Sequence, residues 1–201
     1  MWNRGPKGKI FVVSGPSGSG KSTLLKAVQA KKEFRGDLAK IVTVTTRAPR
    51  RLEAQGKDYY FVSREQFLRL RQKGGFAESQ EVFGEYYGTP KKDLLRVINS
   101  GKDALLCIDV KGAMALRRIF PKEAVFIFIS VADMRSLRQR LSLRSTESGK
   151  SLNTRLKIAK EELNCQKYYD YVIINDVLRR AVSKLAAVIT AERLRQTKER
   201  G

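Results

Sequence analysis

The stretch Gly15-Pro16-Ser17-Gly18-Ser19-Gly20-Lys21-Ser22 decides the fold of this 201-residue chain. It fills the P-loop pattern Gly-x-x-x-x-Gly-Lys-Ser/Thr without a mismatch, and its glycines let backbone N–H groups curl around a phosphate. An apolar run at 10–13 precedes it and a helical apolar pattern at 24–28 follows it, which is the context that the motif requires. Lys21 is then expected to reach the β- and γ-phosphates of a nucleotide, and Ser22 to ligate Mg²⁺. These flanks disfavour the alternative, an ordinary glycine turn.

Composition predicts one domain without a membrane partner. Hydrophobic residues make up 42% of the chain and are interrupted by charge throughout, so no run approaches the ~18 apolar residues of a membrane span. The N-terminus leads directly into the P-loop strand and leaves no room for a removable signal, so we expect a cytoplasmic location. Cys107 and Cys165 lack metal-ligand spacing, and both are expected to be reduced structural residues.

The charge balance is strongly basic. The 41 Lys and Arg residues against 20 Asp and Glu give a net charge of +21, which attracts polyanions of any kind. A merely basic surface and a dedicated nucleic-acid face both fit this number. No recognised nucleic-acid motif is present, so we expect no dedicated nucleic-acid partner and at most a secondary, salt-sensitive affinity. Histidine is absent, so the chemistry must proceed without an imidazole base.

An arginine turn follows the first helix. The β-branched run 40–46 predicts a strand that leads into Arg47-Ala48-Pro49-Arg50. Two arginines around a proline project from a rigid turn, which suits capture of a phosphate or carboxylate, although solvated turn charges fit the spacing equally. The segment 56–62 predicts a turn and an aromatic strand, and Ser63 then caps a helix that ends at Gly74-Gly75.

The second half of the chain alternates helices and apolar strands. A helix is expected over 91–100, followed by a buried strand over 104–109 that ends in Asp109. This Walker B pattern would place an acid beside the P-loop to hold the hydration shell of Mg²⁺; the alternative is an Asp that begins the next loop or helix. Further core strands are predicted at 125–129 and 171–174, before an amphipathic C-terminal helix.

Residues 133–160 form a basic segment with eight positive and two negative side chains. Two helical patterns flank the polar loop 145–151. We interpret them as a mobile flap that closes over phosphates, while solvated charges would look similar.

The sequence resembles guanylate kinase at Thr45 to Arg50, at Gly56-Lys57-Asp58-Tyr59, at Glu78 and at Tyr86-Tyr87-Gly88-Thr89. The similarity runs from Ile10 to the C-terminal helix. The resemblance implies an α/β fold: a three-layer P-loop kinase core with a parallel sheet, a small α/β GMP-binding insert and a helical lid. The implied division assigns 1–42, 99–132 and 161–201 to the core, 43–98 to the insert and 133–160 to the lid.

The resemblance also implies the activity and the site. The enzyme would move the γ-phosphate of ATP to GMP with Mg²⁺ as cofactor, giving ADP and GDP, as a monomer or homodimer. Arg47, Arg50, Tyr59 and Tyr87 would hold the GMP phosphate. Glu78 and Thr89, with Thr43 where serine is common, would read the guanine edge, whose N1–H and amine a carboxylate can accept together. The lid arginines Arg140, Arg144 and Arg155 would neutralise the transferring phosphoryl group, and Asn175 would contact the adenine side of ATP.

The complete predicted site has four overlapping sets. The catalytic set is Lys21, Arg47, Arg140, Arg144 and Arg155; the ATP set is Gly15, Pro16, Ser17, Gly18, Ser19, Gly20, Lys21, Ser22 and Asn175; the GMP set is Thr43, Arg47, Arg50, Tyr59, Glu78, Tyr87, Thr89 and Asp109; the metal set is Ser22 and Asp109.

Three positions depart from the family pattern: Cys107 stands where many members carry an acid, Lys111 replaces a common glutamine, and Ser145 replaces a glycine. None removes a group that the chemistry needs. Two rival functions share the fold, namely a kinase of phosphorylated sugars and a catalytically inactive protein-binding module. Glu78 and Thr89 favour GMP over a sugar, and the intact Gly20-Lys21-Ser22 disfavours an inactive module.

Overall fold

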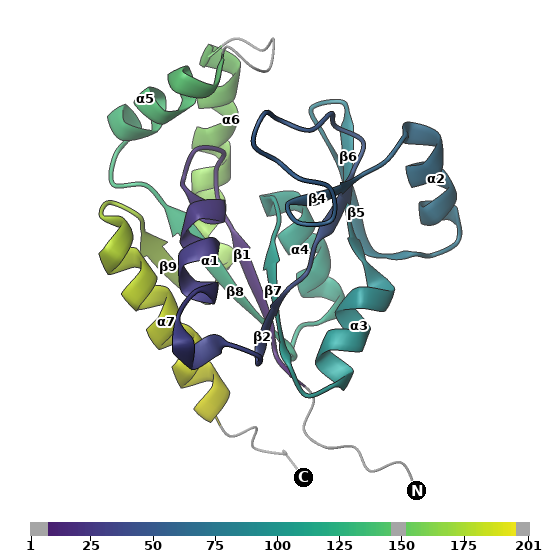
Figure 1. The fold of residues 1–201 in the computed structure, drawn as a ribbon. Coiled ribbons are helices and arrows are strands. Elements are labelled where there is room, and N and C mark those ends of the chain that lie inside the picture. Colours follow the sequence, from purple (N-terminus) through teal and green to yellow (C-terminus); the bar gives the residue numbers. More distant parts are fainter. Residues whose placement is uncertain (1–7, 146–151, 196–201) are drawn as a thin grey trace, which may run out of the picture.

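The computed structural model describes residues 8–145 and 152–195, and two sheets organise these ranges (Figure 1). The larger sheet is parallel, in the order β2 (Leu38–Lys40), β7 (Asp103–Cys107), β1 (Ile10–Ser14), β8 (Ala124–Ser130) and β9 (Tyr171–Ile174). The smaller sheet has the order β4 (Tyr59–Phe61), β3 (Thr43–Thr45), β6 (Glu85–Pro90) and β5 (Phe76–Val82). In it, β3 pairs parallel with β4 and antiparallel with β6.

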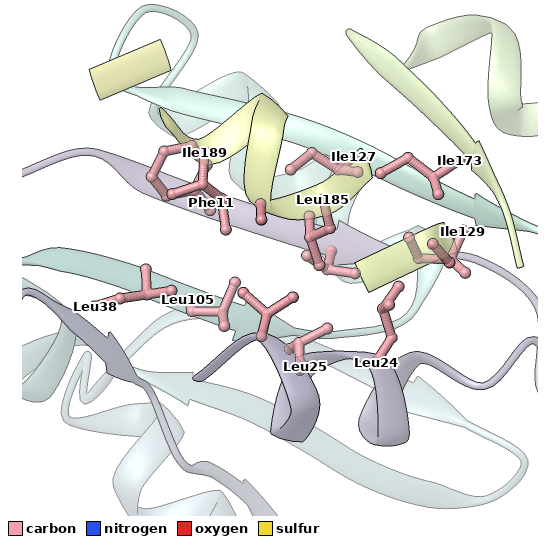
Figure 2. Packing of buried hydrophobic residues seen from close by; sticks show 14 of the residues in the cluster. Phe11, Leu24, Leu25, Leu38, Leu105, Ile127, Ile129, Ile173, Leu185 and Ile189 are labelled. Carbon is pink, nitrogen blue, oxygen red and sulfur yellow. The ribbon is translucent and has the colours of Figure 1, made fainter. Parts of the chain in front are cut away.

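Helices cover both faces of the larger sheet, because its central strands are apolar on both sides. Phe11 and Val13 of β1 lie in the cluster beneath α1 (Lys21–Gln29) and α7 (Leu178–Leu194). Figure 2 shows Leu24, Leu25, Leu185 and Ile189 of these helices gathered around that face. Ile10 and Val12 lie in the opposite cluster, beneath α3 (Lys91–Asn99) and α4 (Val110–Ile119). The predicted three-layer core is confirmed.

The smaller sheet packs on α2 (Arg64–Gln72) through aromatic rings. The ring of Phe67 stacks on those of Phe76 and Tyr86, with centroids 4.5 and 5.3 Å apart. The predicted cap of this helix is confirmed, since Ser63 and Gln66 exchange hydrogen bonds between side chain and backbone at 2.9 and 3.1 Å. These contacts give the smaller sheet an apolar cluster of its own.

The helices α5 (Met134–Ser145) and α6 (Leu152–Asn164), to which the resemblance assigns the role of a lid and which are called the lid below, pack on each other around Leu137, Leu141 and Ala159. Most of the predicted loop between them, residues 146–151, lies outside the described residues. Two 3₁₀ turns, η1 (Lys32–Phe34) and η2 (Cys165–Tyr168), complete the elements. The predicted boundaries at 98/99 and 160/161 fall inside α3 and α6. No helix in the described ranges is long and apolar enough to cross a membrane.

Two details of the predicted strands are wrong. The run 40–46 is not one strand: β2 pairs with β7 in the larger sheet, and after Ile41 and Val42 the chain enters the smaller sheet as β3. The strand predicted to end in Asp109 ends at Cys107 instead. Asp109 is the N-cap of α4, where its carboxylate accepts the N–H of Gly112 at 2.9 Å. Asp109 therefore begins a helix rather than ending a strand, and its role toward Mg²⁺ stays a prediction.

Candidate active site

A cavity of about 730 Å³ lies where the larger sheet, the smaller sheet and the lid meet. In Figure 1, α5 and α6 stand on one side of the turn between β1 and α1, and the smaller sheet stands on the other. Most predicted site residues line this cavity. They are Gly15, Ser17, Gly18, Gly20, Lys21, Ser22, Thr43, Arg47, Arg50, Tyr59, Glu78, Tyr87, Asp109 and Arg155.

The P-loop forms the floor of the cavity at the start of α1. Gly20 has a left-handed φ of 86°, and a Cβ there would lie 2.5 Å from Nδ2 of Asn175, so this position requires glycine. The buried Asn175 side chain donates to the Ser19 carbonyl at 2.8 Å and thus supports the loop from behind. The ammonium of Lys21 donates to the carbonyl oxygens of Gly15 and Pro16 at 2.6 and 2.9 Å.

The arginine turn forms the wall on the side of the smaller sheet. The guanidinium of Arg47 lies 5.4 Å from the ring centroid of Tyr59 and 5.9 Å from that of Phe61, within cation–π range. The rings of Tyr59 and Tyr87 meet edge to face at 6.2 Å. Cation and phenol hydroxyls therefore converge on one part of the cavity, as anion binding requires.

A buried carboxyl group faces the same cavity from β5. Glu78 is 7% exposed and accepts the hydroxyl of Thr89 on β6 at 2.6 Å. The pKa of Glu78 is raised to about 7, chiefly by burial and with a smaller contribution from the negative charge of Asp109, while hydrogen bonds from Thr89 lower it. Gly112 of α4 leaves room for this carboxyl, because a Cβ there would lie 2.8 Å from Oε2 of Glu78.

The remaining predicted residues whose side chains the structure describes contact the cavity residues without lining the cavity themselves. Thr89 donates its hydroxyl to Glu78, and Pro16 and Ser19 are buried residues of the P-loop. Arg140 donates to the carbonyl of Asn175 at 3.2 Å and so stands behind the P-loop. Arg144 belongs to α5, and its side chain lies outside the described residues.

The oxygen donors in the cavity fit a small hard cation. The Ser22 hydroxyl and the Asp109 carboxylate both line it, and Mg²⁺ typically takes one or two protein oxygens and completes its shell with water and substrate phosphates. Within residues 8–145 and 152–195, no cluster of three or more Cys, Asp or Glu side chains could hold a metal ion by itself. A cation at this site would therefore depend on the phosphates that accompany it.

Sequence reasoning missed several cavity residues, of which Glu162 is the most unexpected. It lies on α6, one turn beyond Ile158 and two turns beyond Arg155, and all three residues line the cavity. Helical spacing from Arg155 could have found it, because positions i, i+3 and i+7 share one helix face. Burial raises the pKa of Glu162, while the positive charge of Lys21 lowers it.

Cys107 also lines the cavity, and burial raises the pKa of its thiol. Both cysteines are free, as predicted.

Known proteins share this fold and sequence over almost the whole chain. The guanylate kinase family model matches residues 7–192. A guanylate kinase of Caldanaerobacter subterraneus subsp. tengcongensis is 44% identical over 189 residues, which are 94% of this chain and 90% of that protein. One of Clostridium acetobutylicum is 43% identical, covering 94% and 88%. The crystal structure of guanylate kinase from Anaplasma phagocytophilum has a TM-score of 0.78 and 37% identity, covering 95% of this chain and 89% of that one. The chain belongs to the guanylate kinase family.

Proposed function

We propose how this site carries out the activity of the chain, the ATP-dependent phosphorylation of GMP to GDP. The observation that carries the assignment is the buried Glu78 carboxyl, which faces the same cavity as the P-loop. A carboxylate accepts the N1–H and the amine of guanine together, whereas adenine has no such pair of donors. Glu78, with Thr89 bonded to it and Thr43 on the cavity wall, therefore selects the acceptor base.

The acceptor phosphate binds at the arginine turn. Arg47 and Arg50 supply the positive charge, and the hydroxyls of Tyr59 and Tyr87 add donors. An oxygen of this phosphate attacks the γ-phosphorus of ATP, and the bond from that phosphorus to the bridging oxygen breaks, so that ADP leaves. No general base is needed, because the second pKa of a phosphate monoester is about 6 and the attacking oxygen is already largely ionised. This agrees with a chain that has no histidine.

The donor phosphates bind at the P-loop. Lys21 and the lid residues Arg140, Arg144 and Arg155 neutralise the charge that spreads over the transferring group, and Asn175 supports the loop near the adenine side. Ser22 and Asp109 would hold Mg²⁺, which would neutralise charge on the phosphates of ATP. The cytoplasmic location and the oligomeric state, monomer or homodimer, stay predictions.

A panel of acceptors tests the assignment. ADP release would be measured with ATP and Mg²⁺ in the presence of GMP, AMP, CMP, UMP or ribose bisphosphate, and we expect strong turnover with GMP alone. Glu78→Ala should abolish the preference for GMP while ATP binding is retained. Glu81→Ala, which changes an exposed carboxylate on the same strand, is the matched control.

The other outcomes separate the rivals. Turnover with the sugar phosphate would support phosphoryl transfer at the P-loop but contradict the assignment of a guanine-binding site. Absence of turnover with every acceptor would indicate a binding module. Unchanged selectivity of Glu78→Ala would contradict the role of Glu78 as the base reader.

A further inference from the structure

Glu53, in the turn between β3 and β4, forms ion pairs and hydrogen bonds with both arginines of the arginine turn, Arg47 and Arg50. Its carboxylate oxygens Oε1 and Oε2 lie 2.9 and 2.8 Å from the terminal nitrogen NH2 of Arg47. Oε2 also accepts the backbone N–H of Arg50 at 2.9 Å, and Oε1 lies 3.9 Å from the NH1 nitrogen of that residue. One carboxylate therefore joins the two arginines assigned to the acceptor phosphate.

Glu53 could either compete with the acceptor phosphate for the arginines or hold the arginines in place for it. Its position relative to the cavity distinguishes these two roles. Arg47 and Arg50 line the cavity, whereas Glu53 does not. Its side chain is only 17% exposed. A carboxylate that mimicked the phosphate and competed with it would have to occupy the cavity itself. Glu53 instead contacts the arginines from outside the space that the substrate enters.

Three further contacts fix Arg47 together with Glu53. The NH1 nitrogen of Arg47 donates to the Ala48 carbonyl at 2.6 Å, and the rings of Tyr59 and Phe61 lie within 5.9 Å of its guanidinium carbon. The backbone N–H of Glu53 donates to the Arg50 carbonyl at 2.9 Å and closes the turn. A guanidinium held in this way loses little conformational freedom when an anion binds.

We propose that Glu53 is a positioning residue for the acceptor phosphate, which holds Arg47 and the Arg50 backbone ready for it. The inference rests on the roles proposed above for these arginines. Glu53 also offsets the repulsion between Arg47, Arg50 and the neighbouring Arg51, all of which line one cavity. Without its charge, the repulsion among these arginines would be uncompensated, and the hydrogen bonds from the Arg47 guanidinium and the Arg50 backbone N–H would weaken.

Glu53→Gln tests the proposal, because it keeps the shape of the side chain and removes the charge. We expect the KM for GMP to rise about tenfold, consistent with the loss of charge-assisted hydrogen bonds, while kcat and the KM for ATP change less than about twofold. Glu53→Asp, which restores the charge on a shorter side chain, should recover part of the loss. Glu65→Gln is the matched control, since Glu65 is an exposed carboxylate on α2 that also pairs with an arginine.

Calorimetric binding of GMP and of guanosine separates positioning from a merely structural effect. Glu53→Gln should weaken binding of GMP and leave binding of guanosine unchanged, because only GMP presents a phosphate to the arginine turn. Equal losses for both ligands, an unchanged KM or tighter binding of GMP would each overturn the proposal. If the unmodified protein fails to phosphorylate GMP, the proposed function fails instead, so the two failures are distinguishable.

Discussion

Glu78 is a carboxyl group whose burial makes the stability of the protein depend on pH near neutrality. Its pKa is raised to about 7 by burial and by Asp109, above the ordinary value of 4.5 that it regains on unfolding. The folded protein thus binds this proton more tightly than the unfolded chain does. The contribution of Glu78 to stability is fully present below about pH 4.5 and is lost as the pH rises through 7.

Glu78→Gln should remove this dependence. We expect the free energy of unfolding of the wild type, relative to the variant, to fall by about 2 kcal/mol between pH 5 and pH 8. Urea unfolding of both proteins at several pH values measures it. Subtracting the free energies of unfolding of the two proteins cancels the contributions of other titrating groups. One of these is Glu162, because burial also raises its pKa. Curves that stay parallel over this range would show that Glu78 does not titrate there.

At the residue scale, the sequence predicted Glu78 as the base reader, a role that stays a prediction, but it did not predict the residues that support Glu78. Glu78 and Thr89 stand within a recognisable motif, and their contact at 2.6 Å is consistent with that prediction. Gly112 and Glu53 could not be found in this way. The need for glycine at 112 arises only because α4 packs against β5, and the role of Glu53 only because its turn folds back on Arg47.

At the element scale, a group of hydrogen bonds and ion pairs, here called the clasp, joins Lys9 before β1 and Arg193 of α7 to the amino end of the larger sheet. Asp103, the first residue of β7, accepts the backbone N–H of Lys9 at 2.8 Å and the side chain of Arg193 on α7 at 2.5 Å. Glu192 beside it is 4% exposed and accepts the hydroxyl of Tyr171 at 2.7 Å. The clasp fastens α7 to the sheet far from the P-loop end of β1.

Removal of this clasp should lower stability without affecting catalysis. Asp103→Ala leaves a partly buried N–H and a partly buried guanidinium without their acceptor, so we expect the free energy of unfolding to fall by about 2–3 kcal/mol. Urea unfolding measures this free energy. The control variant is Asp93→Ala, which removes the exposed ion pair of Asp93 with Arg96 on α3 and should lower the free energy of unfolding by less than about 1 kcal/mol. The kcat for GMP should change less than about twofold in both variants. A marked loss of activity in Asp103→Ala would link the clasp to the site.

Local patterns predicted most elements, because strands such as β8 and helices such as α2 carry their signals in their own residues. The run 40–46 shows where such reasoning fails. Its β-branched residues favour extended backbone throughout, and only the partners decide that Lys40 pairs with Leu105 while Val44 pairs with Gly88 in the other sheet. Asp109 is a similar case, since strand and helix compete for the same short segment before α4.

At the scale of the whole molecule, the cavity combines three parts that have separate apolar clusters. The lid cluster around Leu137, Leu141 and Ala159 is distinct from the cluster of Val44, Phe67 and Tyr86 in the smaller sheet and from those of the core. Yet Arg155 from α6, Arg47 from the arginine turn and Lys21 from the P-loop line one space. Because the clusters are separate, we expect the parts to move as units and these cations to reach their catalytic spacing only when the parts approach one another.

This arrangement predicts that hydrolysis of ATP in the absence of GMP is slow. With the acceptor bound, the lid and the smaller sheet can approach it from both sides, which brings the lid arginines to the transferring group and excludes water. Without it, the cations of Arg47 and Arg155 stay apart and stabilise the transition state less. We expect ADP release from ATP and Mg²⁺ alone to be at least ~100-fold slower than with GMP, since arginine contacts of this kind contribute 10³ or more in related reactions. Guanosine, which fills the base site but supplies no phosphate to Arg47, should restore little of the rate. Comparable ADP release with and without GMP would show that the three parts are already arranged for catalysis before the acceptor binds.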